Sequence, residues 1–148
     1  MAFRFPLQAV FHFRQSIEHQ QELRLRAANQ LVARTRHLIE QLDARMEEMR
    51  IKHSYELGSG TTAAELRFAL QCEAVLLHHR QALQGELLRL EKLRDEQQKI
   101  FQQARRERET FESLRDHQLQ EYERDRARRE QREIDDLFLL RRAYRHRG

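Results

Sequence analysis

The feature that most constrains this chain is that only Gly58-Ser59-Gly60 stands where a long helix would be interrupted. The sole proline is Pro6, and the remaining glycines are Gly85 and Gly148. Glycine and proline are the strongest local breakers of regular structure. The sequence therefore predicts an all-α fold in which two very long helices are joined by one tight turn.

We expect a single domain over residues 1–148, built as a long antiparallel two-helix coiled coil. The first helix should cover about 6–56, the turn 57–61, and the second helix about 62–144. Thr62 and Glu65 form a capping-box pattern, in which a hydroxyl and a carboxylate each accept a free N–H at a helix start. This pattern supports a second helix that begins directly after the glycines.

Heptad spacing predicts which faces of the two helices meet. Between Leu25 and Met49 the apolar residues are separated alternately by three and four positions, as in a coiled-coil seam. On the second helix we expect the seam to pass through Leu66, Ala69, Glu73, Leu76, Arg80, Leu83, Leu87 and Leu90, and then through Leu93, Gln97, Ile100, Ala104, Phe111, Leu114, Gln118 and Tyr122. Folding back at Ser59 would place Leu42 opposite Leu76 and leave the residues beyond about Gln118 as a C-terminal helix overhang.

The overhang ends in a short apolar cluster. A run of mixed charge from Glu121 to Asp136 leads into Leu137-Phe138-Leu139-Leu140, followed by Tyr144. We interpret Leu137, Phe138, Leu140 and Tyr144 as a partner-docking element. Self-association and a frayed tail are the alternative interpretations.

Composition favours a solvated rod. Charged residues make up 35% of the chain, against roughly 25% in ordinary soluble domains. The net charge is only +4, and acidic residues interrupt any basic stripe, which argues against a nucleic-acid binder. The single cysteine, Cys72, favours a reducing compartment, and no apolar run approaches the ~20 residues of a membrane span. We expect a protein of the cytosol, or one peripheral on a membrane facing the cytosol.

No constellation for chemistry stands out. The eight histidines include no pair at the spacing of a helical metal site, so surface histidines are the simpler interpretation. Gly58-Ser59-Gly60-Thr61 lacks the lysine of a phosphate-binding loop. A two-helix rod also lacks the concave pocket in which a nucleophile would be activated. We therefore expect no enzymatic activity, no metal and no cofactor.

Several segments are similar to a known family. The opening Phe3–Val10 matches a Phe-x-Phe-x-Leu-x-x-Val/Leu start, Arg14–Glu18 supplies an Arg-Gln-x-x-Glu stretch, and Ala104–Leu114 resembles an Ala-x-x-x-Arg-Glu-x-x-x-Leu pattern. Together with a hairpin break near residue 60, these motifs resemble the flagellar FliJ family over the whole chain.

The resemblance implies a function in the flagellar type III protein export apparatus. It implies a non-enzymatic, central-stalk-like coiled coil that promotes assembly and activity of the hexameric export ATPase ring. It further implies contact with the cytoplasmic part of the export-gate membrane protein, escort of export chaperones, and no nucleic-acid partner. The expected location is cytoplasmic, peripheral at the cytoplasmic face of the inner membrane, and the free protein is expected to be a monomer. An injectisome counterpart and a purely structural scaffold coiled coil are the alternatives.

The resemblance also implies two sets of contact residues. The export-gate contact would lie near the hairpin, where Leu42 and Leu76 match the family's apolar pattern and Met49 joins them, while Cys72 and His79 depart from it. The ATPase contact would lie at the open end of the hairpin. Its expected members are Phe3, Phe5, Leu7, Leu137, Phe138, Leu140, Arg141, Arg142 and Tyr144.

Overall fold

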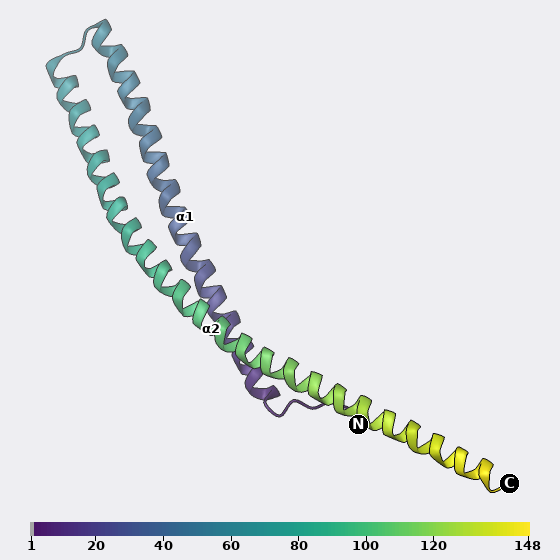
Figure 1. Cartoon of the computed structure of the whole chain (residues 1–148). Coiled ribbons are helices and arrows are strands. Elements are labelled where there is room, and N and C mark those ends of the chain that lie inside the picture. The colour runs from purple at the N-terminus through teal and green to yellow at the C-terminus, as the bar shows by residue number, and fades with distance from the viewer. Residues whose placement is uncertain (1) are drawn as a thin grey trace. The chain divides into compact units, whose positions relative to one another are not determined.

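Two helices account for nearly all of the structure (Figure 1). A computed structural model describes residues 2–148, and within them it contains α1 (Gln8–Ser59, 52 residues) and α2 (Ala63–His146, 84 residues) and no strand. At 1.5 Å per residue the helices are about 78 Å and about 126 Å long. The helices pack against each other as a hairpin, which confirms the predicted all-α antiparallel coiled coil.

The turn is shorter than expected and lies slightly later in the chain. The first helix continues through Leu57 and Gly58 to Ser59, so only residues 60–62 connect the helices. Gly60 has a φ of 91°, a left-handed conformation that strongly favours glycine. The capping box forms as predicted: Glu65 N donates to Thr62 Oγ1 and Thr62 N donates to Glu65 Oε2, both at 3.3 Å.

The chain divides into two compact units, which we describe separately. The hairpin unit is His19–Gln102, and the open-end unit joins the residues up to Glu18 with Gln103–Gly148. The core of the hairpin unit is a row of buried side chains spaced by three and four residues on α1, completed by one residue of α2. These residues are Val32, Thr35, Ile39, Leu42 and Leu90.

Cross-helix polar contacts set the register of the hairpin unit. Arg36 pairs with Glu91 at 2.8 Å, and the guanidinium of Arg80 pairs with the carboxylate of Asp43. Placing Leu42 opposite Leu76 would instead bring Asp43 opposite residue 75, so the predicted register is wrong. The reason is that the turn is centred near Thr61 rather than Ser59, which moves the partners of Arg36 and Asp43 further along α2.

Beyond Leu90 the seam of α2 agrees with the prediction at Gln97, Ala104, Phe111, Gln118 and Tyr122, but differs from it at three positions. Leu93, Ile100 and Leu114 are exposed, whereas the residue directly after each is half-buried. Stepping by four and three from Leu90 gives the observed seam: Arg94, Gln97, Phe101, Ala104, Arg108, Phe111, Arg115, Gln118 and Tyr122.

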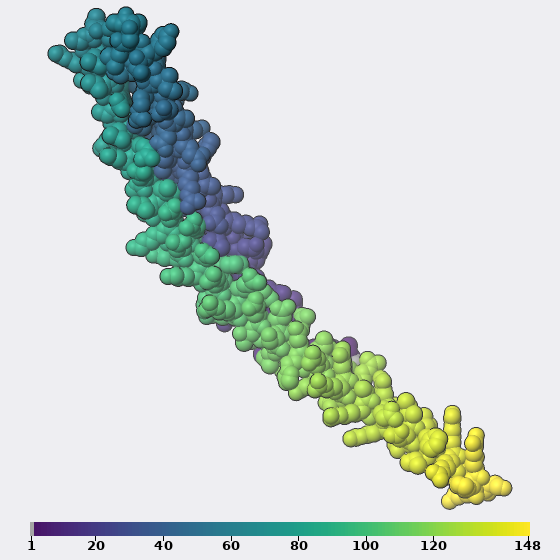
Figure 2. All heavy atoms as spheres, turned by 45° about the horizontal axis from the view of Figure 1, so that its top comes forward, coloured from purple at the N-terminus to yellow at the C-terminus, as the bar shows by residue number. Residues whose placement is uncertain are grey.

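In the open-end unit, the N-terminal segment and the start of α1 pack on α2. Phe5, Phe11 and Ala104 are buried there, and the rings of Phe3 and Tyr122 lie 5.5 Å apart between centroids. From Glu123 to Gly148 every residue is exposed. The overhang therefore exists but begins after Tyr122, later than the predicted Gln118, and Figure 2 shows it as the yellow end of the molecule.

Candidate partner-binding surfaces

The apolar cluster of the overhang is fully accessible. Leu137, Phe138, Leu139 and Leu140 are 56%, 65%, 59% and 61% exposed. Successive residues of an α-helix are rotated by about 100°, so four consecutive apolar residues surround the helix axis. A helix that is apolar all round is normally buried on all sides. These four side chains therefore form a collar around the helix. A partner that binds one side of the helix would leave part of this collar exposed to water.

The overhang also changes the phase of its apolar residues relative to the seam. Continuing the seam steps beyond Tyr122 reaches Asp125, Arg129, Arg132 and Asp136, all charged. The exposed Ile134, which we did not predict as a contact, lies three and four residues before Leu137 and Phe138 and shares their face. This face points away from the side on which α1 packs.

Basic side chains lie next to the collar. Arg141, Arg142 and Arg145 are exposed and form no ion pair within residues 2–148. Guanidinium groups with free donors can bind carboxylates through bidentate hydrogen bonds. Tyr144 is 84% exposed beside them, so the end of the overhang combines apolar, aromatic and cationic groups.

The three N-terminal residues expected at the ATPase contact are placed differently from one another. Phe5 is buried, and Phe3 is half-buried against Tyr122. Leu7 is exposed, though only just. Phe3 and Phe5 therefore fasten the N-terminal segment to α2, and of the three only Leu7 is exposed, with 37% of its surface accessible.

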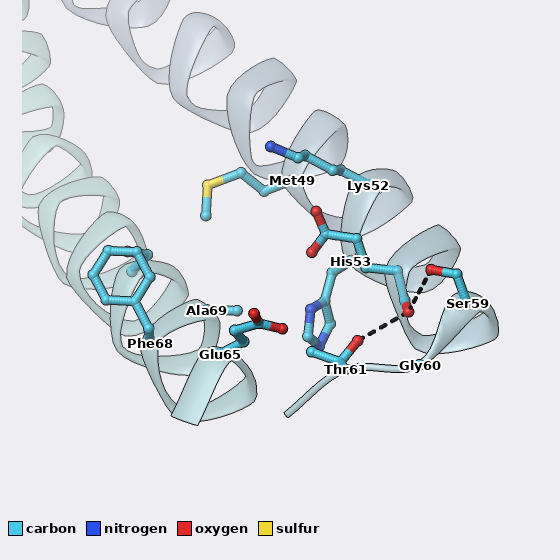
Figure 3. A pocket seen from close by; sticks show the side chains of 11 residues that line it. Met49, Lys52, His53, Ser59, Gly60, Thr61, Glu65, Phe68 and Ala69 are labelled. Carbon is cyan, nitrogen blue, oxygen red and sulfur yellow. Dashed lines mark hydrogen bonds between the residues drawn. The ribbon is translucent and has the colours of Figure 1, made fainter. Parts of the chain in front are cut away.

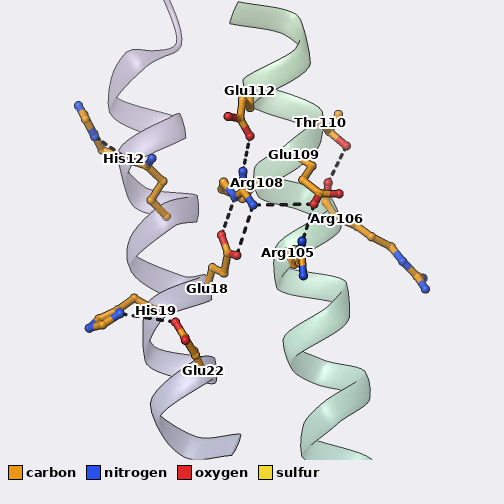
Figure 4. A network of polar contacts seen from close by, with 11 residues as sticks. His12, Glu18, His19, Glu22, Arg105, Arg106, Arg108, Glu109, Thr110 and Glu112 are labelled. Atoms are coloured by element: carbon orange, nitrogen blue, oxygen red, sulfur yellow. Dashed lines mark hydrogen bonds and ion pairs between the residues drawn. The ribbon is translucent and has the colours of Figure 1, made fainter. Parts of the chain in front are cut away.

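A charged network crosses the seam of the open-end unit (Figure 4). Arg108 Nε donates to Glu18 Oε2 at 2.6 Å, and the same guanidinium reaches Glu112 and, at 3.8 Å, Glu109. The side chains of Arg108 and Glu18 are each only 19% exposed. The hydrogen bond that Arg108 donates to Glu18 raises the pKa of Arg108 above its ordinary value, against an opposing effect of burial. Arg108 therefore occupies the seam as a permanently charged, partnered residue.

Two reciprocal cation–π contacts flank this network. Arg115 lies 5.2 Å from the centre of the Phe11 ring, and Arg14 lies 6.0 Å from that of Phe111. Each contact joins an arginine of one helix to a phenylalanine of the other. Such contacts stabilise by about 0.5–2 kcal/mol, depending on how far the cation is desolvated. The seam here is held by arginine chemistry as much as by aliphatic packing.

The hairpin end carries an open hollow of about 510 Å³ (Figure 3). Its walls include Met49, His53 and Phe68, with Cys72 and the residues of the turn. Thr61 Oγ1 and Ser59 Oγ both donate to the carbonyl of Glu56, which holds the turn against the end of α1. The hollow is open, and charged side chains such as Lys52 and Glu65 line it together with the apolar ones.

The three residues expected at the export gate do not share one exposed surface. Leu42 is buried in the seam, whereas Met49 and Leu76 are half-buried and line a small hollow with Met46. The most exposed apolar groups nearby are Tyr55, Phe68 and Val75, at 84%, 68% and 68%. The sequence-based prediction missed these three residues because it considered only seam positions. They could have been found as apolar residues at positions that do not belong to the seam.

Neither a metal-binding cluster nor a membrane-spanning helix occurs in the part of the chain that the structure describes. The candidate sites of residues 2–148 are exposed surfaces. They comprise the collar with its basic neighbours and the hollow at the hairpin end.

The family model of the flagellar FliJ protein matches residues 3–148. Neither the curated proteins nor the solved structures include a match to the chain. Since the family model spans essentially the whole chain, from the N-terminal segment through both helices, this protein belongs to the FliJ family of flagellar protein-export components.

Proposed function

We propose that this chain is a non-enzymatic stalk that binds the hexameric flagellar export ATPase through its overhang. The observation that carries the proposal is the collar of Leu137–Leu140, which is apolar around the whole helix and exposed. A ring of subunits surrounds a central helix on every side, so it can cover such a collar completely. The basic Arg141, Arg142 and Arg145 would pair with carboxylates of the ring.

The energetics favour a contact of this kind. Burying one large apolar side chain stabilises a complex by roughly 1.5–3 kcal/mol, before the cost of association is subtracted. Four such side chains would support binding and the assembly of the ring around the stalk. The protein would act in the cytoplasm, at the cytoplasmic face of the inner membrane where the export apparatus is built.

The hairpin end would contact the export gate. Met49 and Leu76 contribute half-buried apolar surface, and the exposed Phe68 and Tyr55 lie close by along the helices. Leu42 supports this end from within the seam, so its replacement by a charged residue would weaken the hairpin itself. Export chaperones are the third proposed partner class, and a scaffold role without an ATPase is the alternative function.

The test is ATP hydrolysis by the purified export ATPase with added full-length protein. Replacing Leu137 and Phe138 by glutamate should reduce stimulation at least about tenfold, because two carboxylates would enter an apolar contact. Ala127→Glu/Gln131→Glu adds the same charge to exposed positions of the overhang and should leave stimulation unchanged. Equal stimulation by both variants would assign the ATPase contact to another surface.

A further inference from the structure

The two long sides of the hairpin unit differ in character. On one side, residues that directly follow a seam residue bridge the helices: Arg36 follows Thr35, Glu91 follows Leu90, and their side chains pair at 2.8 Å. Asp43, which follows Leu42, pairs with Arg80 on α2. This side is closed by ion pairs.

Apolar residues occupy the positions that directly precede seam residues. Leu31 and Leu38 precede the buried Val32 and Ile39 on α1, and Leu93 and Ile100 precede Arg94 and Phe101 on α2. In an antiparallel pair the two helices are related by a local two-fold, so equivalent positions share one side. The Arg36–Glu91 pair shows this for the positions after the seam, and the positions before it therefore share the opposite side.

These four residues form what we call the lateral apolar face. Leu31 and Leu93 lie at nearly the same level, because the register of the Arg36–Glu91 and Asp43–Arg80 pairs places Leu31 opposite residues 92–96 of α2. The exposed fractions of Leu31, Leu38, Leu93 and Ile100 are 49%, 39%, 45% and 50%. A stripe that is wider than a two-helix seam is typical of helices that pack on a third helix.

The charges around this face select the kind of helix that fits. On α1, Arg24, Arg34 and Arg45 are spaced from Leu31 and Leu38 by three, four or seven residues, so they lie along the same side. None of them forms an ion pair within residues 2–148. On α2, Glu86 is already paired with Arg89 at 2.9 Å, which leaves Glu96 as the unpaired carboxylate.

We infer that the lateral apolar face binds an amphipathic helix of another protein, whose apolar stripe is flanked by carboxylates. Three unpaired arginines against one unpaired glutamate give the face a net positive charge. A second copy would bring like charges together, whereas an acidic helix would place its carboxylates beside the arginines. This site goes beyond the proposed function, because it uses neither the collar nor the hollow at the hairpin end.

The test uses the full-length protein and a synthetic helical peptide with leucines at heptad spacing flanked by glutamates. We expect saturable binding by fluorescence anisotropy, and at least tenfold weaker binding of a twin peptide in which lysines replace the glutamates. Leu31→Gln/Leu93→Gln should raise the Kd of the acidic peptide at least tenfold. Leu88→Gln is the matched control, since Leu88 is 68% exposed but lies on another side of α2, and its Kd should not change.

Several results would overturn the proposal: no binding, equal binding of the two peptides, or equal binding by the two variants. A free protein that sediments as a dimer and becomes monomeric in Leu31→Gln/Leu93→Gln would assign the face to a second copy, against the proposal. Circular dichroism checks folding, and the single variant Leu38→Gln replaces the pair if the pair loses helix. Stimulation of the ATPase should be unaffected by these variants, so failure here is distinct from failure of the stalk assignment.

Discussion

At the scale of single residues, arginine performs two tasks in the seam of the open-end unit. Arg108 meets the carboxylate of Glu18, and Arg115 covers the ring of Phe11. Arg14 covers Phe111, while its Nε is buried without a hydrogen-bond partner in the described residues. A partnered charge in a coiled-coil seam fixes alignment, because sliding one helix would leave that charge without its partner.

Removing Glu18 should destabilise the protein measurably. Glu18→Ala leaves the largely buried Arg108 without its main acceptor, and we expect a loss of about 1–3 kcal/mol in the free energy of unfolding. Glu130→Ala breaks an exposed ion pair with Arg126 and should change the free energy of unfolding by less than about 0.5 kcal/mol. Urea denaturation followed by circular dichroism measures both, and equal losses would contradict the assignment.

The pH dependence of this contribution follows from the raised pKa of Arg108. A cation whose pKa is raised by folding stabilises the folded state fully below its ordinary pKa and loses that effect only above the raised value. For arginine, the pH at which this stabilising effect is lost is strongly alkaline. The contribution of the Arg108 charge should therefore be constant across neutral pH.

At the scale of the elements, the turn depends on one glycine rather than two. Gly60 has a positive φ, whereas Gly58 lies inside α1 and a methyl group added there would meet no atom within 4 Å. Gly60→Ala should cost about 1–2 kcal/mol, the penalty of a left-handed residue. Gly58→Ala should stabilise by about 0.5–1 kcal/mol through helix propensity. We expect the midpoint of thermal unfolding to fall in Gly60→Ala and to rise in Gly58→Ala. Shifts of the same sign in both variants would refute this assignment.

The elements also show how far the sequence could predict the structure. The helices, the capping box and the α1 seam from Leu25 onward followed from local spacing alone. The register did not, and the α2 seam followed only in part, because beyond Leu90 two apolar phases compete. One phase offers Leu93, Ile100 and Leu114, and the other offers Phe101, Ala104 and Phe111 interleaved with arginines.

The structure adopts the second phase because its arginines find partners across the seam. Arg108 meets Glu18 and Arg115 meets Phe11, contacts that depend on residues some ninety or more positions away. Spacing along one helix contains no information about such partners. The same limit applies to the candidate sites: the collar could be read from the overhang, whereas the lateral apolar face appeared only once the seam was known.

At the scale of the whole molecule, the residues that form the buried core are distinct from the overhang, which we propose as the ATPase contact. The buried side chains come from the N-terminal segment, α1 and the part of α2 before Glu123, and none comes from the overhang. Ending the chain after Tyr122 should therefore leave the midpoint of thermal unfolding nearly unchanged. The same truncation should abolish stimulation of the ATPase. A large drop in the midpoint would show that the overhang contributes to the stability of the hairpin.

The charged seam positions after Tyr122 have a consequence for the length of the overhang. Asp125, Arg129, Arg132 and Asp136 offer α1 no apolar groove to follow. Adding residues before Phe3 should therefore not extend the pairing, and the free part of α2 should stay the same length. In this respect α2 acts as a molecular ruler: its own sequence sets how far the collar stands from the last paired residue, at about 1.5 Å for each intervening position.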